Sequence, residues 1–144
     1  AIIAILAAIA IPQYQTYVVR SQVTRAIGES GDLKVVVEDC LNNGLTTVAD
    51  GAGNCNSTAT GSDILTGDSQ SASVKLPTGT GVPQILSPIV TSGETIIAKL
   101  GNHASASITN STVTWTRDTN GVWTCAFSGL AKYAPASCPG TSGP

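Results

Sequence analysis

Four cysteines carry the most distinctive side-chain chemistry in this chain of 144 residues, at Cys40, Cys55, Cys125 and Cys138. They fit neither the C-x-x-C spacing of zinc sites nor that of dithiol redox motifs, and the single histidine, His103, has no neighbour at ligand spacing. Disulfides are therefore the better interpretation. Three pairings are open, of which the sequence-local one, Cys40 with Cys55 and Cys125 with Cys138, closes two loops of similar size. Disulfides persist in an oxidising compartment such as the periplasm or the cell exterior.

Catalysis is not indicated by the remaining polar residues. His103, Asp63, Asp68, Asp118 and Glu94 are the candidates, but no set of nucleophile, base and orienting group is apparent among them. The sequence also has no phosphate-binding loop. We therefore expect a protein that is not an enzyme, with no catalytic residue, no cofactor and no metal ligand.

The composition favours one loop-rich β head with a neutral surface. Charged residues make up 11% of the chain, well below the roughly 25% usual for soluble domains, and glycine and small polar residues are abundant. The net charge of −2 gives no general attraction for nucleic acid or acidic lipid, because counterion release needs clustered Lys and Arg. The length suits a single hydrophobic core.

Residues 1–11, AIIAILAAIAI, are apolar on every face of a helix and end at Pro12. This run is too short to cross a bilayer and lacks the basic start of a signal peptide, so we expect the apolar helix to begin further upstream. A helix that is apolar all round must be buried by lipid or by other helices, and the alternative is a core helix of a monomeric globule. Pro12 is predicted to kink or locally open the helix.

After Pro12 the pattern becomes amphipathic and predicts one continuous helix to about Leu41. Gly28 and Gly31 weaken this helix and favour a bend there, and Asn42-Asn43-Gly44 is a stop signal. The apolar positions, which recur every third or fourth residue, are Val19, Val23, Ala26, Ile27, Leu33, Val37, Cys40 and Leu41.

The rest of the chain predicts a long loop followed by strands. Residues 43–73 are rich in small polar residues and predict a surface loop with at most one short element. Strands are expected at residues 84–90, 94–100, 112–117 and 122–127, with Pro88 placing the first at an edge and Asn120-Gly121 forming a tight turn.

The predicted fold class is α+β, with the N-terminal helix covering one face of an antiparallel sheet of about four strands. The expected division is a helix over residues 1–42, apolar in 1–12 and amphipathic in 13–42, and a globular head over 43–144. Within the head we expect the loop at 43–73, the sheet at 74–127 and a cysteine-bounded loop at 125–138.

The segments at the two ends of the chain carry a family resemblance. Residues 1–22 read AIIAILAAIAIPQYQTYVVRSQ, residues 33–44 read LKVVVEDCLNNG, and the C-terminal part contains NGVWTC and YAPASCP. The first segment resembles the N-terminal helix of type IVa major pilins of Gram-negative bacteria, including those of Pseudomonas. The second resembles the end of that helix, and the C-terminal motifs resemble the disulfide-bounded loop of the same family. Pilins begin about ten residues earlier, with a methylated Phe and a Glu, so the resemblance implies a subunit lacking its first residues. The Cys40 and Cys55 pair is not general in that family.

The resemblance implies the type IV pilin fold and a structural subunit that assembles with copies of itself into an extracellular pilus. It further implies storage in the inner membrane, inner-membrane assembly machinery and separate ATPase motors. Twitching motility, adhesion, and contacts with host glycolipid, phage and DNA follow from the same resemblance. The alternatives are a minor pilin or tip adhesin, a type II secretion pseudopilin, and a secreted monomeric binding domain.

Two sets of site residues follow. Tyr14 and Tyr17, with Arg20, are either interfacial anchors and subunit contacts or ordinary solvated residues, while the loop at 125–138 is either a receptor-binding surface or only a staple for the last strand. The expected assembly residues are Ile2, Ile3, Ile5, Leu6, Ile9, Ile11, Pro12, Tyr14 and Tyr17. The expected receptor-binding residues are Ser128, Gly129, Lys132, Tyr133, Ala134, Pro135, Ala136 and Ser137, with Tyr133 as a stacking surface and Lys132 as a donor to sugar.

Overall fold

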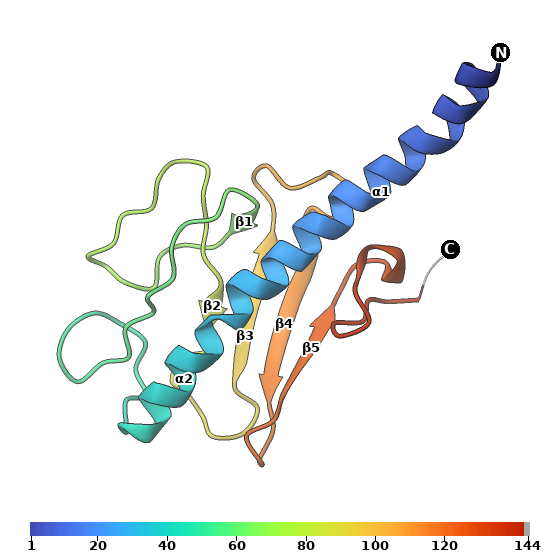
Figure 1. The fold of residues 1–144 in the computed structure, drawn as a ribbon. Coiled ribbons are helices and arrows are strands. Elements are labelled where there is room, and N and C mark those ends of the chain that lie inside the picture. The colour runs from blue at the N-terminus through green and yellow to red at the C-terminus, as the bar shows by residue number, and fades with distance from the viewer. Residues whose placement is uncertain (143–144) are drawn as a thin grey trace.

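A long helical rod lies across one face of a small sheet in the computed structural model, which describes residues 1–142 (Figure 1). The rod consists of α1 (Ile2–Gly31) and α2 (Leu33–Asn42). Asp32 between them keeps helical dihedral angles, φ −61° and ψ −28°, and its N–H donates to the Gly28 carbonyl at 3.1 Å. The predicted single helix is therefore interrupted only at this residue.

Pro12 does not end the helix. α1 contains Pro12 and continues on both sides of it, so the predicted local opening is not found in this structure. Proline removes only one backbone donor from a helix, and the Thr16 hydroxyl donates to the Pro12 carbonyl at 3.2 Å. The apolar segment thus enters the head as one uninterrupted rod.

Five antiparallel strands make up the sheet, in the order β1-β3-β4-β5, and β2 shares the outer edge of β3 with β1. The α+β class and the helix-on-sheet arrangement are confirmed. The strands are β1 (Leu65–Thr66), β2 (Gln84–Ile85), β3 (Thr95–Leu100), β4 (Thr112–Arg117) and β5 (Trp123–Phe127), and a 3-10 turn η1 (Ala131–Tyr133) follows.

The sheet differs from the prediction at its outer edge. The strand expected at 84–90 is only two residues long, because Pro88 has no N–H to continue a ladder. β1 lies inside the predicted loop at 43–73, where it pairs Leu65 with Leu100. The sheet therefore gains a fifth strand outside the predicted range of 74–127.

The helix packs on the sheet through two groups of buried side chains. One group joins α1 to β3, β4 and β5, and the other joins α2 to β2, β3 and the loop after the helix. The first contains Val19, Val23, Ala26, Ala98, Leu100, Val113 and Phe127; the second contains Leu33, Val37, Cys40, Cys55, Ile85, Ile89 and Ile96. All but two of the predicted core positions of the helix are fully buried, and those two, Ile27 and Leu41, are half-buried.

Trp115 on β4 lies between the two groups and fixes the helix to the sheet. Its indole N–H is within hydrogen-bond distance of the Ile27 carbonyl, at 3.3 Å, and of the Ser30 hydroxyl, at 3.2 Å. The Lys34 ammonium lies 3.8 Å from the ring centroid, a cation–π contact. A Cβ at Gly31 would come within 3.3 Å of the ring, so the absent side chain allows this close approach.

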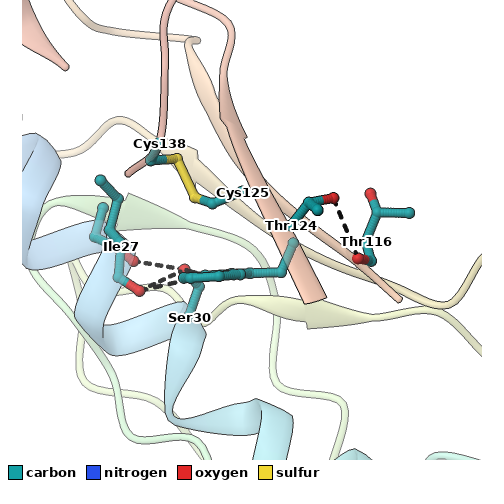
Figure 2. The surroundings of a disulfide bond; sticks show 8 residues. Ile27, Ser30, Thr116, Thr124, Cys125 and Cys138 are labelled. Carbon is teal, nitrogen blue, oxygen red and sulfur yellow. Dashed lines mark hydrogen bonds between the residues drawn. A yellow bond between two sulfur atoms is a disulfide. The ribbon is translucent and has the colours of Figure 1, made fainter. Parts of the chain in front are cut away.

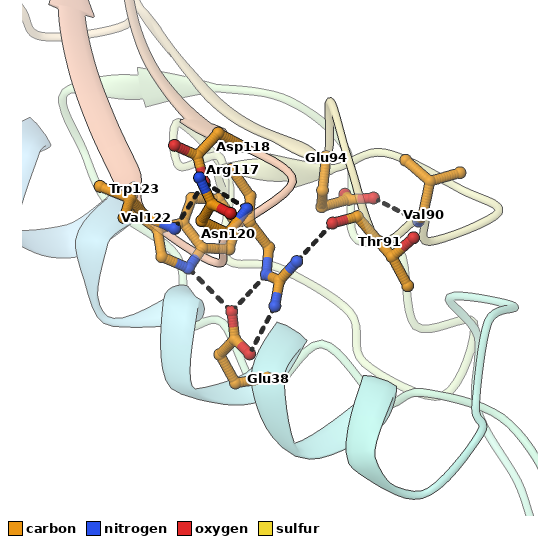
Figure 3. Close-up of polar contacts among 9 residues, drawn as sticks. All are labelled: Glu38, Val90, Thr91, Glu94, Arg117, Asp118, Asn120, Val122 and Trp123. Atoms are coloured by element: carbon orange, nitrogen blue, oxygen red, sulfur yellow. Dashed lines mark hydrogen bonds and ion pairs between the residues drawn. The ribbon is translucent and has the colours of Figure 1, made fainter.

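A second polar contact ties α2 to the far end of the sheet (Figure 3). The Arg117 Nε donates to Glu38 Oε1 at 2.6 Å, and the Trp123 indole N–H donates to the same oxygen at 3.0 Å. The Arg117 guanidinium also donates to the Thr91 carbonyl. Hydrogen bonding from Arg117 holds the pKa of the Glu38 carboxyl below its ordinary value.

Both disulfides follow the sequence-local pairing. Cys40 is bonded to Cys55 and Cys125 to Cys138, across 15 and 13 residues of sequence. The Cys125–Cys138 bond lies beside Ile27 and Ser30 of the helix (Figure 2). One disulfide therefore holds the end of the rod and the other holds the C-terminal loop.

Glu94, immediately before β3, is fully buried although it carries a carboxyl group. Its Oε2 accepts a hydrogen bond from the Val90 N–H at 2.8 Å, while Oε1 has no hydrogen-bond partner among the described residues. Burial raises the pKa of Glu94 above its ordinary value, because the protein interior solvates the ionised form poorly.

Replacing Cys125 and Cys138 together by alanine should lower the free energy of unfolding by about 3 kcal/mol, because the unfolded chain gains loop entropy. The Cys40 and Cys55 double variant should cost about the same, since the two loops are similar in length. Thermal unfolding in the presence and absence of a reductant measures both. Equal melting temperatures for wild type and variants would contradict the stabilising role.

Replacing Glu94 by glutamine should remove a pH-dependent loss of stability. The unfolded carboxyl ionises near pH 4.3, whereas the folded one holds its proton to higher pH, so wild-type stability falls as pH rises through the folded pKa. The stability advantage of Glu94→Gln should therefore grow as the pH rises above the unfolded pKa of about 4.3 and level off once the pH exceeds the raised folded pKa. Melting curves across this range test it, with Asp68→Asn as the control for losing one exposed charge; a constant difference would refute the prediction.

Candidate functional site

The N-terminal part of α1 projects beyond the head (Figure 1). The first buried residue of the helix is Val19, and at 1.5 Å per residue about 25 Å of helix precedes it. The predicted aliphatic assembly residues all lie on this projecting part and are 58–83% exposed: Ile2, Ile3, Ile5, Leu6, Ile9 and Ile11. Burial of such a set stabilises an assembly by on the order of 10 kcal/mol, so the rod is a strong binding surface for an apolar partner.

The helix also meets the length and hydropathy of a membrane span. Its most apolar window is only 6% buried inside the described structure, which distinguishes it from the core helix of a globule. Tyr14 and Tyr17 follow the apolar segment and are 68% and 70% exposed, where an aromatic belt would meet a lipid interface. Pro12 and these tyrosines are therefore as accessible as the aliphatic residues before them.

The C-terminal loop at 125–138 is held in place by backbone hydrogen bonds. The Ala131 N–H donates to the Thr141 carbonyl at 2.9 Å, and the Thr141 N–H donates to the Gly129 carbonyl at 2.8 Å. A Cβ at Gly129 would lie 2.5 Å from the Phe127 ring, so the loop can turn over this ring only with glycine. The loop is thus a folded part of the head.

The predicted receptor-binding residues differ in their exposure to solvent. Ser128, Lys132, Ala136 and Ser137 are exposed, Gly129 and Pro135 are partly covered, and Ala134 is buried in the core. The half-buried Tyr133 packs against the core group that contains Val19. The loop therefore divides into an outer part and an inner part that faces the helix.

The inner part of the loop lines a groove against the helix. Lys132 and Tyr133 form one wall, the α1 residues from Pro12 to Val19 form the other, and Ser105 and Ser107 contribute from the turn after β3. The groove has a volume of about 680 Å³. Sequence reasoning identified Lys132, Tyr133 and Pro12 but missed the two serines, since no residue type or spacing marks them.

The polar residues considered for catalysis do not converge. Asp63 forms an ion pair with Arg25 at 2.7 Å. Asp118 Oδ1 accepts hydrogen bonds from backbone N–H groups in the β4–β5 turn, and the Glu94 side chain is buried. His103 is exposed. Within residues 1–142, no three His, Cys, Asp or Glu side chains lie close enough to hold a metal ion.

Comparisons with known proteins point to bacterial filaments. A family model described as pilin (bacterial filament) matches residues 19–139. A probable minor fimbrial protein of Dichelobacter nodosus is 42% identical over 138 residues, which cover 96% of this chain and 86% of the relative. The type IV major fimbrial protein FimA of the same species is 42% identical over 141 residues, with 96% and 87% covered. A fimbrial protein of Pseudomonas aeruginosa is 37% identical over 145 residues, with 96% and 88% covered.

A solved structure described as a Cs1 pilin chimera has the same fold. It aligns with a TM-score of 0.58 and 20% identity, covering 85% of this chain and 98% of the other. The relatives match along nearly the whole chain, and the family model spans the head together with the helix residues that pack on it. The chain therefore belongs to the pilin family of bacterial filament proteins.

Proposed function

We propose that the chain is a structural subunit of an extracellular type IV pilus and that copies of it assemble through the projecting half of α1. The observation that carries this proposal is the exposed apolar rod on a folded head, because such a rod is stable only when lipid or other helices surround it. The relatives named type IV fimbrial proteins support the same function.

The proposal extends to the life of the subunit before and after assembly. The apolar segment is held in the inner membrane of a Gram-negative cell, and assembly machinery with separate ATPase motors extracts it into the fibre. The fibre then serves twitching motility and adhesion, with host glycolipid, phage and DNA as partners. The outer part of the C-terminal loop, with Ser128, Ala136 and Ser137 exposed, is the proposed receptor-binding surface.

A minor pilin is the second candidate, because two of the similar proteins are named probable minor fimbrial proteins. The two functions differ in how many copies the fibre contains. Electron microscopy and mass spectrometry of sheared fibres, from cells with the gene deleted and then restored, separate them. Loss of all fibres together with a dominant subunit mass supports the major pilin, and sparse copies in persisting fibres support the minor one.

Ile9→Lys should reduce the amount of sheared fibre at least tenfold. A charge in the apolar segment costs about 2.5–3.5 kcal/mol in lipid. Burying the same charge in a bundle of apolar helices is also unfavourable. Immunoblots of sheared fibres, normalised to the subunit in the membrane fraction, measure assembly apart from insertion.

The matched control is Val35→Lys, which places the same charge on an exposed aliphatic position of α2 beside the head. This variant should assemble as wild type does. Normal fibres from Ile9→Lys, or a wild-type chain found only as a soluble monomer, would refute assembly through the helix.

A further inference from the structure

The groove between α1 and the C-terminal loop begins where the apolar segment ends. Its helix wall runs from Pro12 to Val19, and its opposite wall is Tyr133 with Lys132. At 1.5 Å per residue the helix wall is about 10 Å long, roughly two turns, which is the length of about seven residues of a second helix running alongside it. The groove thus suits a short stretch of helix lying beside α1.

Its lining combines apolar and polar side chains. Pro12, Val18 and Val19 provide aliphatic surface, and Tyr133 packs against the core on one side of its ring. Among the described residues, Lys132 is the only charged one in the lining, and its ammonium lies 5.0 Å from the Tyr133 ring centroid. A neutral apolar occupant would therefore cover the aliphatic side chains of the lining without placing a second charge beside Lys132.

The same chain supplies an occupant with these properties. Residues 1–12 contain no charged side chain, and in the described structure their large aliphatic groups are 58–83% exposed. This segment continues as one helix along α1 (Figure 1), and the groove lining begins at Pro12, where the segment ends. A second helix packed beside the first therefore reaches the groove without a change of direction.

We propose that the groove formed by α1, Ser105, Ser107 and the Lys132–Tyr133 wall receives the apolar N-terminal segment of a second copy of this chain. The inner part of the C-terminal loop is then an assembly element, separate from the exposed outer part. This inference rests on the proposed function and specifies which surface of one subunit accepts the helix of the next.

A photo-cross-linking amino acid, p-benzoylphenylalanine, in place of Tyr133 tests the contact in assembled fibres. Irradiation should produce covalent dimers, and mass spectrometry should place the cross-link within residues 1–11 of the second copy. Restricting the measurement to dimers excludes cross-links to the α1 of the same subunit, which migrate as monomers. Dimers joined only through other residues would overturn the inference.

Filling the groove provides an independent test. Ser107→Trp should lower the yield of sheared fibre at least tenfold while the melting temperature of the full chain in detergent stays within a few degrees of wild type. Ser92→Trp, the same substitution at an exposed loop position outside the groove lining, should leave the yield unchanged. Wild-type yield from Ser107→Trp, or an equal loss from both variants, overturns the inference.

Different results refute the proposed assembly and the proposed groove contact. If wild-type cells make no fibres of this chain, assembly itself is refuted and the groove contact with it. If normal fibres form but the dimers lack a cross-link to residues 1–11, only the groove contact is refuted.

Discussion

The α1 helix packs its C-terminal half on its own sheet and leaves its apolar N-terminal part exposed among the described residues 1–142. Val19, Val23 and Ala26 are buried against the head, whereas Ile2 to Ile11 face outward in every direction. No rearrangement of the head can cover residues 2–11, about 15 Å of helix, which lie beyond the groove. The head is therefore folded, but the apolar segment stays exposed until a partner covers it. The main property of this surface is that it favours association.

The head holds this rod at several separate points. Trp115 contacts it near Ile27 and Ser30, the Glu38–Arg117 pair holds α2, and the Cys40–Cys55 disulfide joins the end of the rod to the next loop. Force applied along the helix is thus distributed over the sheet and does not act on a single contact. Such a connection suits a subunit whose helix belongs to the shaft of a fibre.

The regular elements could be predicted because their side chains repeat with a period. Alternation at Thr112–Arg117 defined β4 to the residue, and the spacing from Val19 to Cys40 identified the buried stripe of the helix. A short element was expected somewhere in residues 43–73, but the position and pairing of β1 could not be predicted, since a strand of two residues has no period and is defined by the pairing of Leu65 with Leu100. The burial of Glu94 was also missed, because a carboxyl group normally indicates an exposed position.

The candidate site could likewise be predicted only in part from the sequence. The apolar segment was evident from composition alone, and the pairing that the structure has is one of the three that the cysteine spacing left open. The groove was not foreseeable, because Ser105 and Tyr133 are brought to α1 by the β3–β4 connection and by the C-terminal disulfide loop. Proximity of this kind arises from topology and leaves no pattern in the sequence.

The position of the rod at one end of the head has a consequence for symmetry. A surface that projects in one direction cannot meet the same surface of a partner and still place both heads side by side, so the contact is heterologous. Heterologous contacts that do not close into a ring give an open array with polarity. One end of such an array finishes in heads, and the other finishes in bare apolar helices. That second end is stable only in a non-aqueous environment, so the fibre has a single end that can face water.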